Sequence, residues 1–314
     1  MKKFKFLIVS TVLLIVGVVI LSVFITDKLN DYKDKQTNIS EQLNFENRLL
    51  NAWEWVPFTN VGEEMVKTWQ ELEVKAKADY NGALFYGMLL LFWVAIYAFS
   101  NVLVYKDTEL NYRAFGFVAV FAALSFLYLG LSAPLLEISA FSEDLTFEVP
   151  ISDVTGDDFF GLGWDMTEYN LDRTVEGRTY YFYQNKSILQ LISILYTGGN
   201  FLVAFILIGF SIVFPALKLF MSLRILAAPH KKRSLKQYRI IRSLGKWSMA
   251  DVFVSAIFLA IFAYSNMEVG IDTGSSTLAG TYFFMIFVVI SISSGRFLKK
   301  SMKKAQEVAE WVLE

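Results

Sequence analysis

Long runs of uncharged apolar residues constrain the fold of this chain more than any other feature. About 20 such residues span a bilayer as an α-helix, because a helix satisfies its own backbone hydrogen bonds there. Only 19% of residues are charged and 55% are hydrophobic, which is more apolar than a soluble domain. We therefore predict an all-α polytopic membrane protein with about six transmembrane helices. The predicted spans are Leu7–Thr26, Ala83–Tyr105, Ala114–Pro134, Asn200–Leu223, Met249–Tyr264 and Ala279–Gly295.

The distribution of charge predicts how these helices are oriented. Arg224–Lys246 holds eight Lys or Arg and no acid, and Lys299 and Lys300 lie in a second basic cluster after the last span. Leu135–Lys186 carries eleven acidic residues against three basic ones, and Asp27–Gly82 carries eleven against seven. Because basic loops stay in the cytoplasm, we predict that both termini of this multi-pass membrane protein are cytoplasmic. The first span has a basic start but no small-x-small cleavage pattern, which favours an uncleaved anchor.

These spans divide the chain into three parts. Residues 1–105 form an N-terminal transmembrane hairpin with a helical extracytoplasmic segment (27–82). Residues 106–298 form a four-helix membrane core with an extracytoplasmic segment (135–186), and residues 299–314 form a cytoplasmic tail. In the first outer segment, Val61, Met65, Trp69 and Leu72 recur at helical spacing. This stripe packs the hairpin on itself or docks a partner, and the polar stretch Asn38–Ser40 is a candidate turn.

The second outer segment has the character of a small β-rich region. Apolar and polar residues alternate in Leu145–Val149, and Arg178–Tyr183 is rich in strand formers. The acid pairs Glu143-Asp144 and Asp157-Asp158 have no EF-hand spacing, so we interpret them as solvated acids rather than calcium ligands. The run Ser187–Tyr196 then predicts an amphipathic interfacial helix, which ends at Gly198-Gly199 before the fourth span.

Two charged residues fall inside the predicted spans, Lys218 in the fourth and Asp251 in the fifth. Charges at membrane depth are costly, so they are normally paired or functional. Pro215 removes a backbone donor and should kink the helix just before Lys218. Ser248-x-x-Asp251 also fits a helix N-cap pattern. Asp251 is therefore either a cap residue or the partner of Lys218.

Signatures of enzymes and of metal or nucleotide binding are missing from the sequence. There is no cysteine, and the one histidine, His230, lies in a run of basic residues. No nucleophile–base pair, metal-ligand set or phosphate-binding loop appears. We therefore predict that the protein is not an enzyme, uses no cofactor, and binds neither nucleotide nor nucleic acid.

Several of these segments resemble a known family. Phe214-Pro-Ala-Leu-Lys-Leu219, a basic loop, and Lys246-Trp-Ser-Met-Ala-Asp-Val-Phe253 are similar to the paraquat-inducible protein A family of bacterial inner-membrane proteins. Leu129-Gly-Leu-Ser-Ala-Pro-Leu-Leu136 resembles the exit of that family's first core helix. The resemblance covers about residues 114–295 and leaves out the N-terminal hairpin. Family members commonly carry cysteine zinc ribbons and two membrane modules, whereas this chain has no cysteine and one module.

The resemblance implies a location in the bacterial inner membrane and a function. It implies a role in moving lipids between the inner and outer membranes, beside periplasmic proteins with mammalian-cell-entry (MCE) domains. The predicted partners are therefore membrane lipids and an MCE-domain protein. An envelope sensor or an assembly scaffold is the alternative function. The candidate functional residues are Pro134, Pro215, Lys218, Trp247, Ser248 and Asp251.

Overall fold

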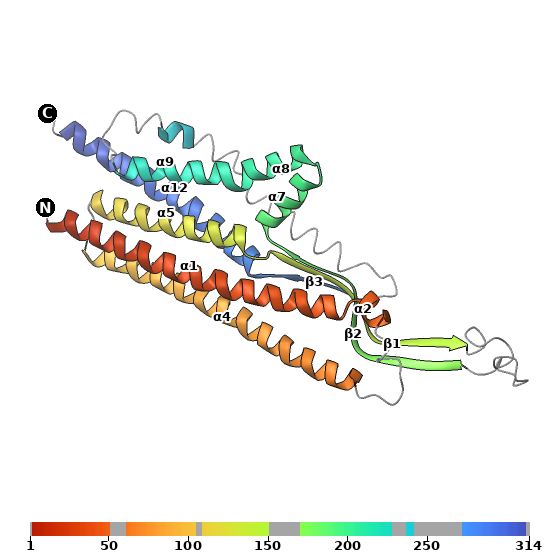
Figure 1. Ribbon diagram of the computed structural model, residues 1–314. Coiled ribbons are helices and arrows are strands. Elements are labelled where there is room, and N and C mark those ends of the chain that lie inside the picture. The colour runs from red at the N-terminus through yellow and green to blue at the C-terminus, as the bar shows by residue number, and fades with distance from the viewer. Residues whose placement is uncertain are drawn as a thin grey trace, which may run out of the picture.

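The computed structural model describes residues 2–50, 61–104, 109–150, 170–227, 237–241 and 272–311. Within these residues, five helices are long and apolar enough to cross a membrane, which confirms the predicted helical membrane fold. The sixth predicted span, Met249–Tyr264, lies outside the described residues. The five are α1 (Lys2–Gln42), α4 (Val61–Val104), α5 (Glu109–Ser132), the continuous run of α8 (Phe201–Ile208), η2 (Gly209–Val213) and α9 (Phe214–Ala227), and α12 (Ala279–Trp311) (Figure 1).

Helix α5 lies at the centre of the helical bundle and contacts α1, α4, α9 and α12. Phe126 and Leu129 of α5 and Phe284 and Phe287 of α12 are at most 1% exposed. An added Cβ at Gly130 of α5 would lie 2.8 Å from the Cα of Phe284, so the two backbones approach closely. Tight packing of this kind holds membrane helices together, because lipid supplies no hydrophobic driving force between them.

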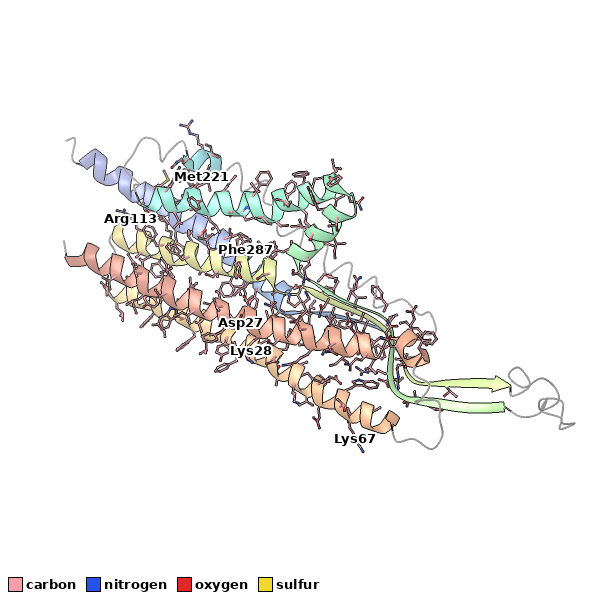
Figure 2. All side chains as sticks on the ribbon, in the orientation of Figure 1. Asp27, Lys28, Lys67, Arg113, Met221 and Phe287 are labelled. Carbon is pink, nitrogen blue, oxygen red and sulfur yellow. The ribbon has the colours of Figure 1, made fainter. Side chains whose placement is uncertain are left out.

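The outer surface of the bundle carries an apolar band. On α1, eight large apolar side chains are exposed from Val9 to Phe24, and on α4 a comparable set is exposed from Phe85 onward. Exposed apolar surface on this scale is unusual for a soluble protein and fits contact with lipid. The band ends on α1 at Asp27 and Lys28 (Figure 2).

Paired charges mark this edge of the apolar band. Lys28 Nζ lies 2.7 Å from a carboxylate oxygen of Asp79 on α4, and Lys35 pairs with the other oxygen. Beyond this edge of the band, α1 continues from residue 27 to Gln42, a length of roughly 24 Å at about 1.5 Å per residue. Helix α4 runs beside it, so the first two membrane helices extend well past the band. The predicted turn at Asn38–Ser40 is wrong, because these residues are still in α1.

A three-stranded sheet lies at the same end of the bundle as this helical extension. It consists of β1 (Leu136–Pro150), β2 (Asn170–Lys186) and β3 (Asp272–Thr277) in the antiparallel order β2-β1-β3. The predicted strands Leu145–Val149 and Arg178–Tyr183 lie within β1 and β2, so both are confirmed. The predicted interfacial helix is also present as α7 (Ile188–Thr197), which begins with a capping box between Ser187 and Gln190.

The extension and the sheet form one unit, which we call the hairpin–sheet module: residues 27–50, residues 61–82 and the three strands. Ile39 and Leu43 of the first segment and Trp69 of α4 pack with Tyr180 of β2. Arg48, in the short helix α2 (Phe45–Leu50), lies 5.1 Å from the Trp69 ring centroid and donates to the Arg178 carbonyl and the Thr179 hydroxyl. Trp69 of the apolar stripe is therefore buried within the protein, against both the hairpin and the sheet.

The opposite end of the bundle is basic. Arg113, at the start of α5, donates hydrogen bonds of 3.0 and 3.1 Å to the carbonyls of Leu226 and Ala227, which end α9. A cation is favoured at a helix C-terminus, so this contact stabilises the end of α9. Helix α1 begins and α12 ends at this basic end (Figure 1). Asp272, in contrast, pairs with Phe141 in the sheet, so Ala227 and Asp272 lie at opposite ends of the bundle.

Candidate functional site

Lys218 is a charged residue placed among the membrane helices. Its Nζ donates a 2.9 Å hydrogen bond to the hydroxyl of Ser291 on α12, and its side chain is half-buried. Figure 2 labels the residues that flank this contact: Met221 lies one turn after Lys218, and Phe287 one turn before Ser291. Lys218 precedes Arg224 by six residues, about 9 Å at about 1.5 Å per residue. The ammonium is therefore less than two turns inside the basic end.

The backbone before Lys218 departs from regular α-helix. Residues Gly209–Val213 form a π-helix, and the N–H of Phe214 bonds to the carbonyl of Gly209 five residues earlier. Pro215, the second residue of α9, is buried, and its ring clashes with an α-helical carbonyl four residues back. A π-helical turn relieves such a clash by shifting the register of hydrogen bonds. The regular α-helix is therefore interrupted shortly before Lys218, close to the kink that Pro215 predicts.

Pro134 has a different environment, at the junction of α5 and β1. Its carbonyl accepts a 2.9 Å hydrogen bond from the N–H of Gly280, and the next carbonyl, of Leu135, accepts 2.9 and 2.7 Å bonds from Leu278 N–H and the Thr281 hydroxyl. The N–H of Leu135 donates to the carbonyl of Lys186 at the end of β2. Pro134 therefore lies in a junction that ties α5, α12 and the sheet together, at the far end of the bundle from Lys218.

The other three candidate residues, Trp247, Ser248 and Asp251, lie outside the described residues. The pairing of Lys218 with Asp251 therefore stays a prediction. The structure adds Ser291, which sequence analysis did not single out. A signal was available, because Ser291 and Ser294 are three residues apart on one face of an apolar helix, and both are buried. Within the described residues, no group of three His, Cys, Asp or Glu could hold a metal ion.

A half-buried carboxyl group lies where the sheet meets the membrane helices. Glu137 of β1 accepts a 2.8 Å hydrogen bond from the hydroxyl of Tyr32 on α1, and it also hydrogen bonds to Tyr183 of β2. Burial raises the pKa of Glu137 above its usual range, and the charge of Glu73 on α4 adds to this. The two tyrosine hydrogen bonds oppose the rise without cancelling it.

Replacing this carboxyl with an amide is expected to make the protein less sensitive to pH. With the folded-state pKa raised, Glu137 contributes most to stability below its unfolded-state pKa, and this contribution is lost as pH rises through the folded-state value. The side chain of Glu137→Gln is neutral at every pH. The melting temperature of the variant minus that of the wild type should therefore increase from acidic to neutral pH. A thermal unfolding series in detergent measures this difference, and a difference independent of pH would contradict the assignment.

Comparison with known proteins places part of the chain in a family context. The family model of paraquat-inducible protein A matches residues 175–301. No curated protein and no solved structure matches the chain. The matched range includes Pro215, Lys218 and Ser291, and it excludes Pro134 and all of α1 and α4. It starts later than the predicted range of 114–295 and ends slightly after it. Residues 175–301 therefore match the paraquat-inducible protein A family, and the predicted resemblance is confirmed over that part of the chain.

Proposed function

We propose that this protein is an integral inner-membrane component of a bacterial envelope system that moves phospholipid or other apolar molecules. The family match over residues 175–301 supports this proposal. The structural observation that carries it is the Lys218–Ser291 contact, because a half-buried ammonium between membrane helices is costly and is normally retained for a function. The family match also covers this contact.

The chemistry of Lys218 suits the phosphate of a phospholipid. An ammonium group has three N–H donors, and Ser291 accepts one of them. The remaining donors can bind a phosphate oxygen in a charge-assisted hydrogen bond. Lys218 lies near the basic end of the bundle. From this depth, the long side chain of lysine can reach the level of the lipid headgroups. We assign Lys218 the role of holding the headgroup while the acyl chains stay among apolar side chains.

The proposed orientation places the basic end in the cytoplasm and the hairpin–sheet module in the periplasm. The clustering of Arg113, Arg224 and Lys300 at one end supports this orientation, since Arg113 bonds to the end of α9 and Lys300 lies over the ring of Tyr112. The module then offers a periplasmic surface to a partner, and the family resemblance suggests an MCE-domain protein. Lipid delivered to such a partner would leave the inner membrane at the end that carries the sheet.

Labelling of single cysteines tests this orientation directly, because the natural chain has no cysteine. Asn38→Cys in the module and Arg224→Cys at the basic end both lie at exposed positions. A membrane-impermeant maleimide added to spheroplasts is expected to label Asn38→Cys at once, and Arg224→Cys only after the membrane is permeabilised. Labelling in the reverse order would overturn the proposed topology.

Transfer of phospholipid between the two membranes tests the function itself. Cells that lack the protein should transfer newly made, isotope-labelled phospholipid between the inner and outer membranes more slowly than cells that produce it. Restoring the wild-type protein should restore the rate. An unchanged rate, with altered induction of envelope stress genes, would instead favour the alternative function as an envelope sensor.

A further inference from the structure

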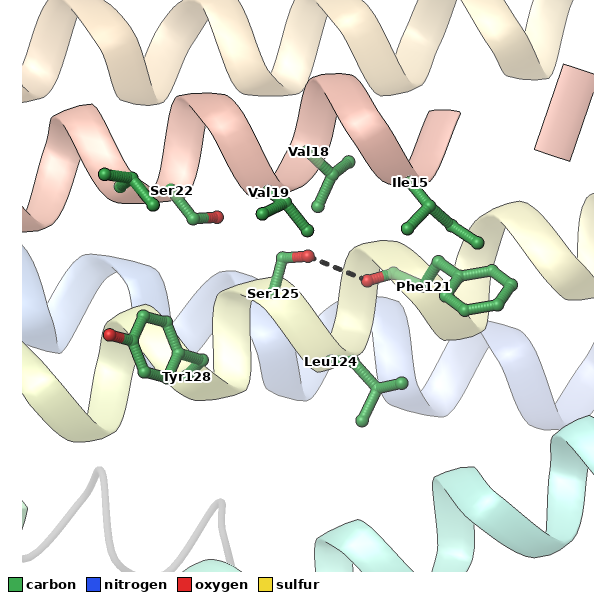
Figure 3. Close-up of a pocket in the computed structure, with 9 residues that line it drawn as sticks. Ile15, Val18, Val19, Ser22, Phe121, Leu124, Ser125 and Tyr128 are labelled. Atoms are coloured by element: carbon green, nitrogen blue, oxygen red, sulfur yellow. Dashed lines mark hydrogen bonds between the residues drawn. The ribbon is translucent and has the colours of Figure 1, made fainter. Parts of the chain in front are cut away.

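An apolar groove lies between α1 and α5 (Figure 3), and its lining includes Val19 and Val23 of the exposed apolar band. Its volume is about 360 Å³. Ile15 and Phe121 line one end, and Ser22 and Tyr128 line the other. Both helices lie outside residues 175–301, so the family match assigns nothing to this groove.

Two serine hydroxyls line the groove, and they differ in their hydrogen bonding. The hydroxyl of Ser125 donates to the carbonyl of Phe121 at 3.0 Å, within its own helix. Ser22 is 7% exposed, and its hydroxyl has no hydrogen-bond partner within the described part of the chain. Burying an unpaired polar group is unfavourable, so a ligand that pairs with this hydroxyl would gain affinity.

The groove has a polar end near the edge of the apolar band and an apolar end deeper in the band. A membrane lipid has the same arrangement, with its polar headgroup at the edge and its acyl chains inside. Ser22 precedes Asp27 by five residues, so it lies about 7.5 Å from the charged edge of the apolar band at about 1.5 Å per residue. The end at Ile15 and Phe121 lies near the middle of the band, which runs from Val9 to Phe24 on α1. The tyrosine at the Ser22 end is typical of the headgroup boundary of a membrane.

We propose that this groove binds one acyl chain of a membrane phospholipid. In this arrangement, the ester carbonyl of the lipid accepts a hydrogen bond from Ser22, and the acyl chain runs along the apolar walls toward Phe121. The occupant is a lipid because the groove opens within the apolar band, where the surrounding medium consists of acyl chains. This site is separate from Lys218, and it does not depend on the proposed transport function.

Lipid retained by the purified protein tests the groove. The protein is reconstituted in vesicles of phosphatidylethanolamine and phosphatidylglycerol, extracted into detergent, and examined by native mass spectrometry. Val19→Trp places a bulky ring in the groove, at a residue that is 55% exposed and so tolerates the change. The matched control is Val16→Trp on the same helix, which is 49% exposed and does not line the groove.

Wild type and Val16→Trp are expected to retain one phospholipid per chain, and Val19→Trp is expected to lose it. Ser22→Ala, which keeps the groove open, should lower retention about fivefold or more, as expected for the loss of about 1 kcal/mol. Equal retention by Val19→Trp and Val16→Trp would overturn the proposal. A disulfide between two copies of a Val19→Cys variant in membranes, with no lipid retained, would also overturn it, because a second copy would then cover the groove.

Discussion

Replacing Gly280 with alanine is expected to destabilise the protein, because the backbone around this position leaves no room for a Cβ atom. A Cβ at this position would lie 2.6 and 2.7 Å from the carbonyl oxygens of Ala133 and Pro134. These are backbone atoms, and the Gly280 N–H already bonds to the Pro134 carbonyl. The clash can therefore be relieved only by moving α12 away from the α5–β1 junction, which breaks this hydrogen bond.

Overpacking of this kind typically costs about 1–3 kcal/mol, and we expect Gly280→Ala at the upper end of that range. Gly130→Ala should behave similarly, because its Cβ would lie 2.8 Å from the Cα of Phe284. The matched control is Gly295→Ala on the same helix α12, where nothing lies within 4 Å of an added Cβ. That variant should be neutral, or more stable by about 0.5–1 kcal/mol, because alanine favours a helix. Melting temperatures in detergent measure all three, and equal values for Gly280→Ala and Gly295→Ala would contradict the close contact.

Replacing Lys218 with methionine is expected to slow transfer of phospholipid about tenfold or more while leaving the protein folded. Methionine keeps the length of the side chain and removes the ammonium that binds Ser291. A hydrogen bond to a charged group is worth about 1.5–3 kcal/mol, so its loss from a bound headgroup would slow transfer about tenfold or more. The Ser291 hydroxyl left behind can bond to a carbonyl of its own helix, so folding should tolerate the change.

The control is Lys218→Arg, which keeps the positive charge and should retain more transfer than Lys218→Met. The measurement is the rate of phospholipid transfer between the two membranes, normalised to the amount of folded protein. The same assay tests the predicted pairing with Asp251 through a double-mutant cycle. If the two residues pair, Lys218→Met with Asp251→Asn should be no worse than the worse single variant. Additive losses would show that they act independently, and full activity of Lys218→Met would exclude a role for the ammonium.

The sequence predicted the membrane helices well because lipid imposes a simple rule. A backbone in hydrocarbon must satisfy its own hydrogen bonds, so each apolar run of about 20 residues becomes a helix. The strands around Phe147 and Tyr180 were also predictable, since apolar and polar residues alternate in one and strand formers fill the other. The interfacial helix α7 was predicted from its amphipathic run and the two glycines that follow.

Features that depend on contacts distant in sequence were not predicted. Strand β3 reads Asp-Thr-Gly-Ser-Ser-Thr, with no apolar alternation, and it forms a strand because β1 offers an edge for hydrogen bonding. Helix α1 continues through the polar Asn38–Ser40 stretch because Ile39 and Leu43, one turn apart, are buried against Trp69 and Tyr180. Ser291 joined the candidate site only when the fold brought α12 against α9, since the spacing of Ser291 and Ser294 marks one face of α12 but does not identify the helix that packs against it.

Photo-crosslinking from the fourth membrane helix tests the central claim most directly. A photoreactive phenylalanine analogue at Phe214, one turn from Lys218, is compared in native membranes with the same analogue at Val16, which is 49% exposed within the apolar band of α1. If the protein handles phospholipid at the Lys218 site, capture of phospholipid at Phe214 should exceed capture at Val16, and Lys218→Met should remove the excess. Capture at Phe214 no greater than at Val16 would contradict the proposed function.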